Sequence, residues 1–215
     1  MNPQDVPSPI DLRLMEDAVE WERTAMQRPF REDFFAAIVE RLKRRGRPEL
    51  SILELGSGPG FFAAYLLTAL PKARISLLDF SSAMQELAGK RLAPFGERVR
   101  FIHRNFKEPG WSDGLGTYDA VVTIQAVHEL RHKRYAEALH RHVKGLLDEH
   151  GCYLVCDHYF GEDGQQNDQL YMSRAEQGTC LASAGYDVAE VMIRGGRSLY
   201  ECRPTTGDSG SGAMA

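Results

Sequence analysis

Residues 51–60 read SILELGSGPG, and this stretch decides the fold. Apolar side chains fill its first half: Ile52, Leu53 and Leu55. Such a run is typical of a β-strand that is buried on both faces. Glycines follow at alternate positions: Gly56, Gly58 and Gly60. Glycine lets the backbone approach a ligand closely, and residues 61–69 read as an apolar helix, so the stretch predicts a strand, a ligand-binding loop and a helix.

The spacing of these glycines excludes two other nucleotide-binding loops. A dinucleotide fingerprint, G-x-G-x-x-G, needs a third glycine where this chain has Phe61. A P-loop needs G-K-[ST], which the stretch lacks. What remains, Glu54-x-Gly56-x-Gly58-x-Gly60, resembles the first motif of the class I S-adenosylmethionine-dependent methyltransferases. The resemblance implies that Glu54 helps to orient the methionine amino group and that the glycines pass close to the cofactor. A buried strand that ends in an ordinary tight turn is the alternative.

The length and composition are those of a globular protein with one domain. The chain has 215 residues and a formal net charge of -4 at pH 7. No stretch approaches the ~20 apolar residues that cross a bilayer, and no basic stripe interleaved with aromatic residues indicates nucleic-acid binding. The first residues, MNPQDVPSPID, have neither the basic nor the apolar region of a secretion signal. We therefore expect a cytoplasmic protein without a membrane or nucleic-acid partner, and the oligomeric state is left open.

Helical and extended patterns alternate along the chain. Amphipathic helices are expected over residues 10–27 and 30–45, before the glycine loop. Later strands are expected over residues 74–78, 99–103, 118–124 and 152–156, and later helices over residues 82–93, 132–147 and 169–184. Residues 188–193 and 198–202 form a predicted hairpin around Gly195-Gly196. This alternation predicts an α/β fold with a mostly parallel sheet and helices on both faces.

The resemblance covers about residues 30–203 and adds to this fold. It implies a Rossmann-like sheet of seven strands, with the last strand inserted antiparallel in a C-terminal hairpin and two helices before the sheet. We divide the chain into residues 1–28, a lead-in and lid helix, residues 29–203, the methyltransferase domain, and residues 204–215, a disordered tail. Because such helices cover the cofactor pocket in the resembled family, Trp21 and Phe30 are either substrate-side aromatic residues or core residues.

A carboxylate, Asp79, ends the second strand about 20 residues beyond the glycine loop, a separation typical of ribose-binding acids. In an open parallel sheet, ligands bind at the carboxyl ends of the strands, and an acid placed there can accept hydrogen bonds from both ribose hydroxyls. The alternative for Asp79 is a helix-capping or solvated acid. After the third strand, the resemblance implies that Asn105 hydrogen-bonds the adenine amino group while a neighbouring side chain covers the ring. A turn is the alternative for Asn105.

The complete set of residues expected to bind the cofactor is Glu54, Gly56, Ser57, Gly58, Gly60, Asp79, Phe80, Met84, Asn105, Phe106 and Gln125.

The segment that follows Gln125 has two competing interpretations. In the resembled family it lines the donor methyl group and meets the acceptor. It also spells His128-Glu129-Leu130-Arg131-His132, the H-E-x-x-H pattern in which zinc proteases hold both imidazoles on one helix face. The strand pattern just upstream places His128 in a strand-to-helix connection, so we expect no metal. A zinc hydrolase and a non-protease metal site that involves His128 are the alternatives. His140 and His142 lie on a charged helix and are expected to be solvated.

The sequence therefore predicts an S-adenosylmethionine-dependent methyltransferase that moves a methyl group by in-line displacement to a small-molecule acceptor. His128 and His158 follow strand ends on the ligand side, and they are candidate catalytic bases because an unperturbed imidazole titrates near pH ~6.5. A nonenzymatic regulator that binds S-adenosylmethionine is a further alternative. The identity of the acceptor, the atom that is methylated and the need for a base are left open.

Overall fold

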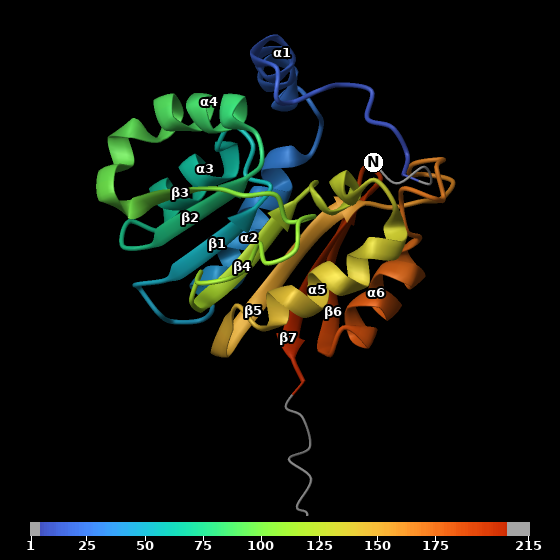
Figure 1. Ribbon diagram of the computed structural model, residues 1–215. Helices are drawn as coiled ribbons and strands as arrows, with labels where there is room; N and C mark the ends of the chain where they lie inside the picture. Colours follow the sequence, from blue (N-terminus) through green and yellow to red (C-terminus); the bar gives the residue numbers. More distant parts are fainter. Residues whose placement is uncertain (1–4, 206–215) are drawn as a thin grey trace, which may run out of the picture.

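The computed structural model describes residues 5–205, which form one sheet with helices on both faces (Figure 1). Five parallel strands come first: β1 (Ser51–Leu55), β2 (Arg74–Asp79), β3 (Val99–His103), β4 (Tyr118–Ile124) and β5 (Leu147–His158). The hairpin of β6 (Tyr186–Arg194) and β7 (Arg197–Pro204) follows, and β7 pairs antiparallel with β5. The strand order, β3-β2-β1-β4-β5-β7-β6, confirms the predicted Rossmann-like fold with its inserted antiparallel strand.

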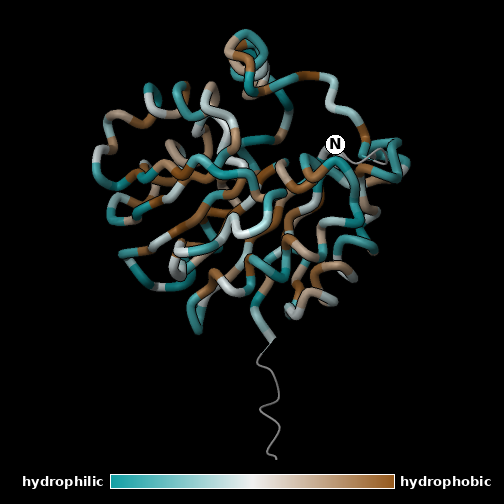
Figure 2. The backbone as a smooth tube through the Cα atoms, in the orientation of Figure 1, coloured by the Kyte–Doolittle hydropathy of each residue, from teal (hydrophilic) through white to brown (hydrophobic). Residues whose placement is uncertain are grey.

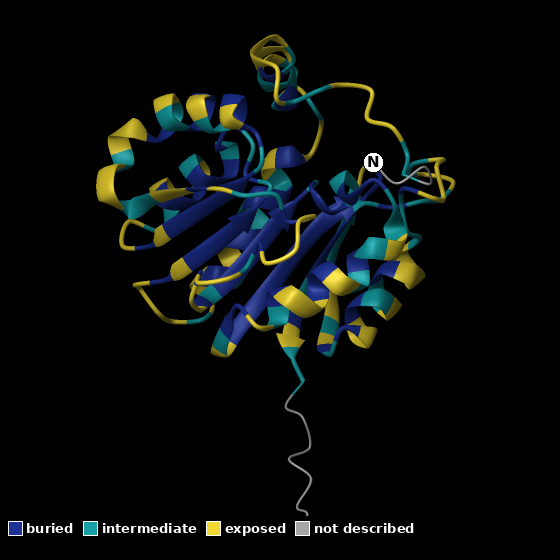
Figure 3. Ribbon diagram, viewed as in Figure 1, coloured by how far each residue is buried: buried dark blue, intermediate teal, exposed yellow. Residues whose placement is uncertain are grey.

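Helices cover the two faces in separate layers. α2 (Arg31–Lys43), α3 (Phe61–Ala69) and α4 (Ser82–Leu92) contribute to one hydrophobic cluster, and α5 (Ala136–Lys144) and α6 (Arg174–Ser183) contribute to the other. Ile52 of β1 belongs to the first cluster, whereas Leu53 and Leu55 belong to the second, as the alternation of side chains along a strand requires. Figures 2 and 3 show that the central strands are both hydrophobic and buried, so the core lies along the sheet.

The N-terminal segment lies across the carboxyl ends of the parallel strands, apart from the two layers (Figure 1). Its helix α1 (Met15–Ala25) packs on α4 through a small cluster that contains Ala18, Met84 and Leu87, with Trp21 packed against it. The short turns η1 (Ala93–Arg98), η2 (Val127–Leu130) and η3 (Lys133–Tyr135) connect the larger elements. Within residues 5–205, no helix combines the length and the apolar character that a membrane span requires.

Three helix boundaries differ from the prediction. The first helix begins at Met15 because the backbone N–H of Leu14 closes a turn onto the carbonyl of Asp11. The helix predicted over residues 132–147 is divided into η3 and the shorter α5, and β5 already begins at Leu147. α6 begins at Arg174, not near residue 169, because Ser173 and Glu176 form a reciprocal capping box. The predicted disordered tail lies, apart from residues 204 and 205, outside the described residues.

Candidate active site

The glycine loop between β1 and α3 is held in shape by backbone hydrogen bonds. The N–H groups of Gly56 and Ser57 donate to the carbonyl of Leu78 at 2.8 and 3.3 Å. Gly56, Gly58 and Gly60 all have positive φ angles, of 67°, 54° and 77°. A Cβ on Gly56 would lie 2.4 Å from the Cβ of Ala126, whereas the nearest atom to a Cβ on Gly58 is 3.9 Å away, on Trp21. The loop therefore packs tightly against the start of residues 125–131 but leaves space at Gly58.

A pocket opens at this loop, at the carboxyl ends of the strands. It is lined by Glu54, Gly56, Ser57, Gly58, Asp79, Phe80, Met84, Phe106 and Gln125, which belong to the set predicted from the sequence. Gly60 and Asn105 of that set do not line it. The Asn105 side chain instead accepts a hydrogen bond from the backbone N–H of Lys107 at 3.0 Å, so it forms a turn, and it lines a neighbouring pocket under residues 7–13.

Asp79 links the glycine loop to the residue that precedes α4. Its Oδ2 accepts a hydrogen bond from the N–H of Gly58 at 2.7 Å, and its Oδ1 accepts one from the N–H of Ser81 at 2.9 Å. Burial raises the pKa of Asp79, although these backbone donors oppose the rise. Ser81, and not Asp79, caps α4, by accepting a hydrogen bond from the N–H of Met84. Asp79 thus fixes the loop and still presents unused lone pairs to the pocket.

Two groups of opposite charge lie in this pocket with unpartnered atoms. Glu54 is 3 % exposed, its Oε2 has no hydrogen-bond partner, and burial raises its pKa to about 8. Arg31, at the start of α2, is 7 % exposed, and its Nε has no partner. Burial, together with the charge of Arg28, lowers the pKa of Arg31 to about 10, so it remains a cation. An ammonium and a carboxylate on one ligand would satisfy both groups. Sequence analysis did not identify Arg31 or Arg28 as site residues.

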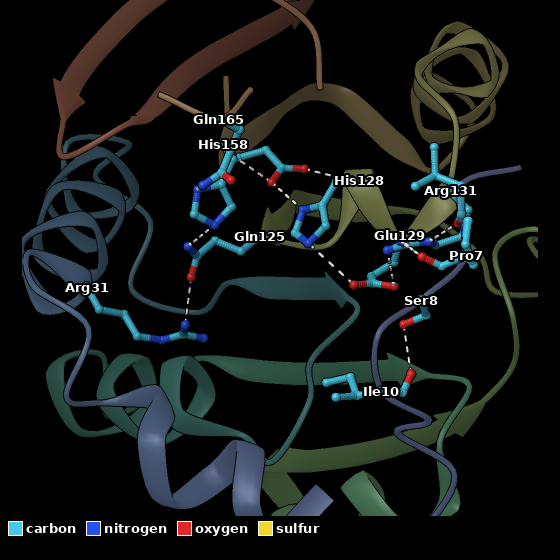
Figure 4. A network of polar contacts seen from close by, with 12 residues as sticks. Pro7, Ser8, Ile10, Arg31, Gln125, His128, Glu129, Arg131, His158 and Gln165 are labelled. Atoms are coloured by element: carbon cyan, nitrogen blue, oxygen red, sulfur yellow. Dashed lines mark hydrogen bonds and ion pairs between the residues drawn. The ribbon is translucent and has the colours of Figure 1, made fainter. Parts of the chain in front are cut away.

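Arg31 also begins a chain of hydrogen bonds along the wall of the pocket (Figure 4). Its Nη1 donates to the Gln125 Oε1 at 2.6 Å, which orients the amide so that Nε2 faces the His158 Nε2 at 2.9 Å. The His158 Nε2 therefore accepts from Gln125, and the His158 Nδ1 lies 3.4 Å from the Gln165 Nε2. Burial lowers the pKa of His158 to about 4, in agreement with a neutral ring. Its lone pair is already engaged by Gln125.

His128 is held on the same wall by two carboxylates (Figure 4). Asp157 accepts a hydrogen bond from the His128 backbone N–H at 2.9 Å, and its Oδ1 lies 2.7 Å from the ring Nδ1. The ring Nε2 lies 3.4 Å from the Glu129 Oε1. Burial disfavours the imidazolium, but the charges and hydrogen bonds of Asp157 and Glu129 outweigh it and raise the pKa of His128 to about 10. Neither His128 nor His158 is therefore arranged as a free base near neutral pH.

The geometry of the H-E-x-x-H stretch differs from that of a zinc site. His128 lies in η2, whereas His132 follows Arg131, whose φ of 67° ends that turn, so the two rings do not share a helix. The His132 Nδ1 accepts a hydrogen bond from the N–H of Arg134 at 3.2 Å. No group of three metal-ligating side chains is present in the described part of the chain. The zinc alternative is not favoured.

His140 corrects another prediction, because it is buried instead of solvated. Its ring is 1 % exposed, and its Nδ1 lies 3.3 Å from the hydroxyl of Tyr153. Burial lowers its pKa to about 4, so it is a neutral polar residue of the core. His142 lies on the exposed side of α5, as predicted.

Residues 52–151 match the family model described as "Methyltransferase domain". A malonyl-[acyl-carrier protein] O-methyltransferase from Paenibacillus sp. (strain JDR-2) is 25% identical over 179 residues, which cover 75% of this chain and 64% of that protein. The ribosomal RNA small subunit methyltransferase H of Streptomyces avermitilis is 37% identical over 70 residues, 32% of this chain and 22% of that protein. The chain thus spans less than two thirds of the length of these curated relatives.

A solved structure resembles nearly the whole chain. It is the Burkholderia thailandensis 1,6-didemethyltoxoflavin-N1-methyltransferase with bound 1,6-didemethyltoxoflavin and S-adenosylhomocysteine, which has a TM-score of 0.65, 21% identity and coverage of 94% of both chains. At this identity the likeness shows the fold.

Proposed function

Since this chain carries a class I S-adenosylmethionine-dependent methyltransferase domain, we propose that it transfers the methyl group of S-adenosylmethionine to a small-molecule acceptor in the pocket beside the glycine loop. The unpartnered Oε2 of Glu54 carries the proposal, because a buried carboxyl oxygen without a partner indicates a hydrogen-bond donor from outside the chain. The cofactor supplies such a donor in its methionine ammonium, and the sulfonium supplies the methyl group.

The residues of the pocket match the other parts of the cofactor. Arg31 would hold the methionine carboxylate through its unpartnered Nε, and Asp79 would accept hydrogen bonds from the ribose hydroxyls. Gly58 is the loop position where the backbone has space for a ligand. Phe106, which is buried at the pocket wall, would cover the adenine ring. The protein then contributes mainly by positioning the acceptor in line with the bond that breaks.

A small acceptor is supported by the roof of the pocket. Trp21 from α1 lines the pocket and lies over Gly58, and Leu12 reaches it from the segment before α1. The hydroxyl of Ser81 donates to the carbonyl of Leu12, which ties this segment to the start of α4. A roofed pocket admits a small molecule more easily than a nucleic-acid helix or a folded protein. The toxoflavin-type neighbour, which has a small heterocyclic acceptor, is consistent with this proposal.

Calorimetric titration of the purified protein tests the proposal. We expect S-adenosylmethionine and S-adenosylhomocysteine to bind with micromolar affinity, and NAD, the control, not to bind. Protein that binds S-adenosylmethionine should then be incubated with a small-molecule library and, separately, with ribosomal RNA, and methyl transfer measured from the radiolabelled cofactor. Failure to bind the cofactor would refute the proposal, and transfer only to RNA would refute the small-molecule acceptor. Binding without transfer to either acceptor class would favour the nonenzymatic regulator.

A further inference from the structure

The acceptor side of the pocket presents cations that lack ionic partners. Arg28 and Arg31 line the pocket and lie 5.2 Å from the ring of Trp21, and neither has a carboxylate within salt-bridge distance in residues 5–205. The Nε of Arg31 is buried and without any partner. Because the proposed function pairs Arg31 with the cofactor carboxylate, Arg28 remains as a cation at the pocket that a second anion would pair.

His128 is a third cation on this wall, and both of its ring nitrogens face carboxylate oxygens. Nδ1 faces the Asp157 Oδ1 at 2.7 Å, and Nε2 faces the Glu129 Oε1 at 3.4 Å. A neutral ring carries one proton, so one of its nitrogens would direct a lone pair at a carboxylate oxygen. The other groups around the ring are His158, which is neutral, Tyr171, whose ring centroid is 5.5 Å away, and Arg131, which contacts Glu129 at 3.4 Å.

The charges that line the pocket balance once Glu54 is ionised, as we expect it to be beside the cofactor ammonium. The cationic side chains are Arg28, Arg31 and His128, and the anionic side chains are Glu54, Asp79 and Glu129. S-adenosylmethionine brings a sulfonium, an ammonium and a carboxylate, and therefore one net positive charge. A neutral acceptor would leave that charge in a buried site, whereas an acceptor with one negative charge would neutralise it.

We infer that the acceptor binds as an oxyanion, that is, a carboxylate, an enolate or an acidic phenolate, and that His128 and Arg28 hold it as cationic hydrogen-bond donors. This inference rests on the proposed function. The contact from His128 Nε2 to Glu129 is long, so an entering oxyanion replaces it, and Glu129 keeps Arg131 as its partner.

An oxyanion also makes a base unnecessary. The transfer forms a bond between the acceptor oxygen and the methyl carbon, and it breaks the bond between that carbon and sulfur, whose electron pair stays on the sulfur. A neutral ether or ester and S-adenosylhomocysteine result, and no proton leaves. This stoichiometry agrees with a wall on which His128 already carries its proton and the lone pair of His158 is engaged by Gln125.

The first test measures the charge of His128 directly. Ring-nitrogen NMR of histidine-labelled protein, saturated with S-adenosylhomocysteine, should show one histidine with both ring nitrogens protonated at about pH 7.5. That signal should vanish in His128→Gln. It should remain in the control His150→Gln, which changes an exposed histidine near the start of β5, at the end of the strand away from the pocket. A neutral His128 ring at this pH would overturn the inference.

The second test measures the preference for an anion. Benzoate and butanoate are titrated into the same S-adenosylhomocysteine complex, each against its uncharged amide, which has nearly the same shape. We expect at least one acid to bind about tenfold or more tightly than its amide, and Arg28→Gln to remove most of the preference. Arg44→Gln, which changes an exposed arginine just beyond α2, should keep it. No preference for either acid would overturn the inference, while normal binding of S-adenosylhomocysteine would leave the proposed function intact.

Discussion

The pKa of Glu54 leads to a prediction that links cofactor binding to pH. Burial raises this pKa from 4.5 to about 8, with a contribution from Asp79, although the charge of Arg31 opposes the rise. At pH 7, a carboxyl group with this pKa is about nine-tenths protonated. A cofactor ammonium next to Glu54 stabilises the ionised form. We therefore expect binding of S-adenosylmethionine at pH 7 to release about 0.9 proton from the protein.

The affinity should follow the same linkage. Binding requires the ionised form of Glu54, and the fraction of this form decreases as the pH falls below the pKa of the free protein. The affinity for the cofactor should therefore fall roughly 50-fold between pH 8 and pH 6. Calorimetry in buffers with different ionisation enthalpies measures the proton release, and titrations across this range measure the affinity. In Glu54→Gln, binding should be weaker, and this pH dependence should disappear. The exposed Glu149→Gln should behave as the unchanged protein does.

Glu54 also makes the folding stability of the free protein depend on pH, in the opposite direction to the cofactor affinity. Because the folded pKa lies above the unfolded value of 4.5, the folded state keeps a proton that the unfolded chain loses. Stability without ligand therefore falls as pH rises from about 4.5 to about 8. At pH 7 the loss is about 3 kcal/mol, so Glu54→Gln should raise the free energy of unfolding of the free protein by up to that amount. Proton release near zero together with an unchanged stability would show that Glu54 is already ionised and would refute this reasoning.

Three further substitutions test the architecture of the site. Asp79→Asn should weaken cofactor binding about 10- to 100-fold in calorimetry, because charge-assisted hydrogen bonds are lost, and an unchanged affinity would remove Asp79 from the site. Gly56→Ala, whose Cβ would lie 2.4 Å from the Cβ of Ala126, should lower the melting temperature more than Gly58→Ala, and equal melting temperatures would contradict the packing of the loop. The guanidinium of Arg131 donates hydrogen bonds to the carbonyls of residues 6 and 7, so Arg131→Gln should release the N-terminal segment and make it cleavable by a low dose of protease. If the variant resists the protease as well as the unchanged protein does, Arg131 does not hold this segment.

Most residues that sequence analysis identified in the site lie within a strand with a clear apolar pattern or shortly after it, as Glu54, Asp79 and Gln125 do, whereas Met84 lies in α4. In a parallel sheet, the carboxyl ends of the strands meet at one edge, so the order of strands along the chain was sufficient to bring these residues together. Asn105 also follows a strand, but a local hydrogen bond to Lys107 competes for its side chain, and one sequence does not reveal which partner is preferred.

The residues that were missed depend on contacts between distant parts of the chain. Arg31 meets Gln125, 94 residues later, and nothing in the amphipathic pattern of α2 indicates which of its arginines turns inward. The charged neighbours of His140 in the sequence led to the prediction that it is solvated, although the spacing of the residues around it indicated burial. Ala136, His140 and Val143 are spaced by four and three residues, which places them on the buried side of α5. The Tyr153 hydroxyl, 3.3 Å from the His140 Nδ1, gives the buried ring a polar partner, and the sequence around His140 does not reveal this contact.

The backbone is strained at both ends of residues 125–131, the segment that carries His128. Gln125 and Arg131 have φ angles of 56° and 67°, and neither is a glycine, so each costs about 1 kcal/mol or more. Contacts from earlier parts of the chain stabilise both residues, because Arg31 of α2 binds the side chain of Gln125, and the backbone of Val6 pairs with that of Arg131. The N-terminal segment therefore roofs the pocket and also holds the Arg131 end of residues 125–131, whereas α2 holds the Gln125 end. Loss of the N-terminal segment should then loosen the backbone at the Arg131 end, close to His128, so the roof and this end of the acceptor wall depend on the same contacts.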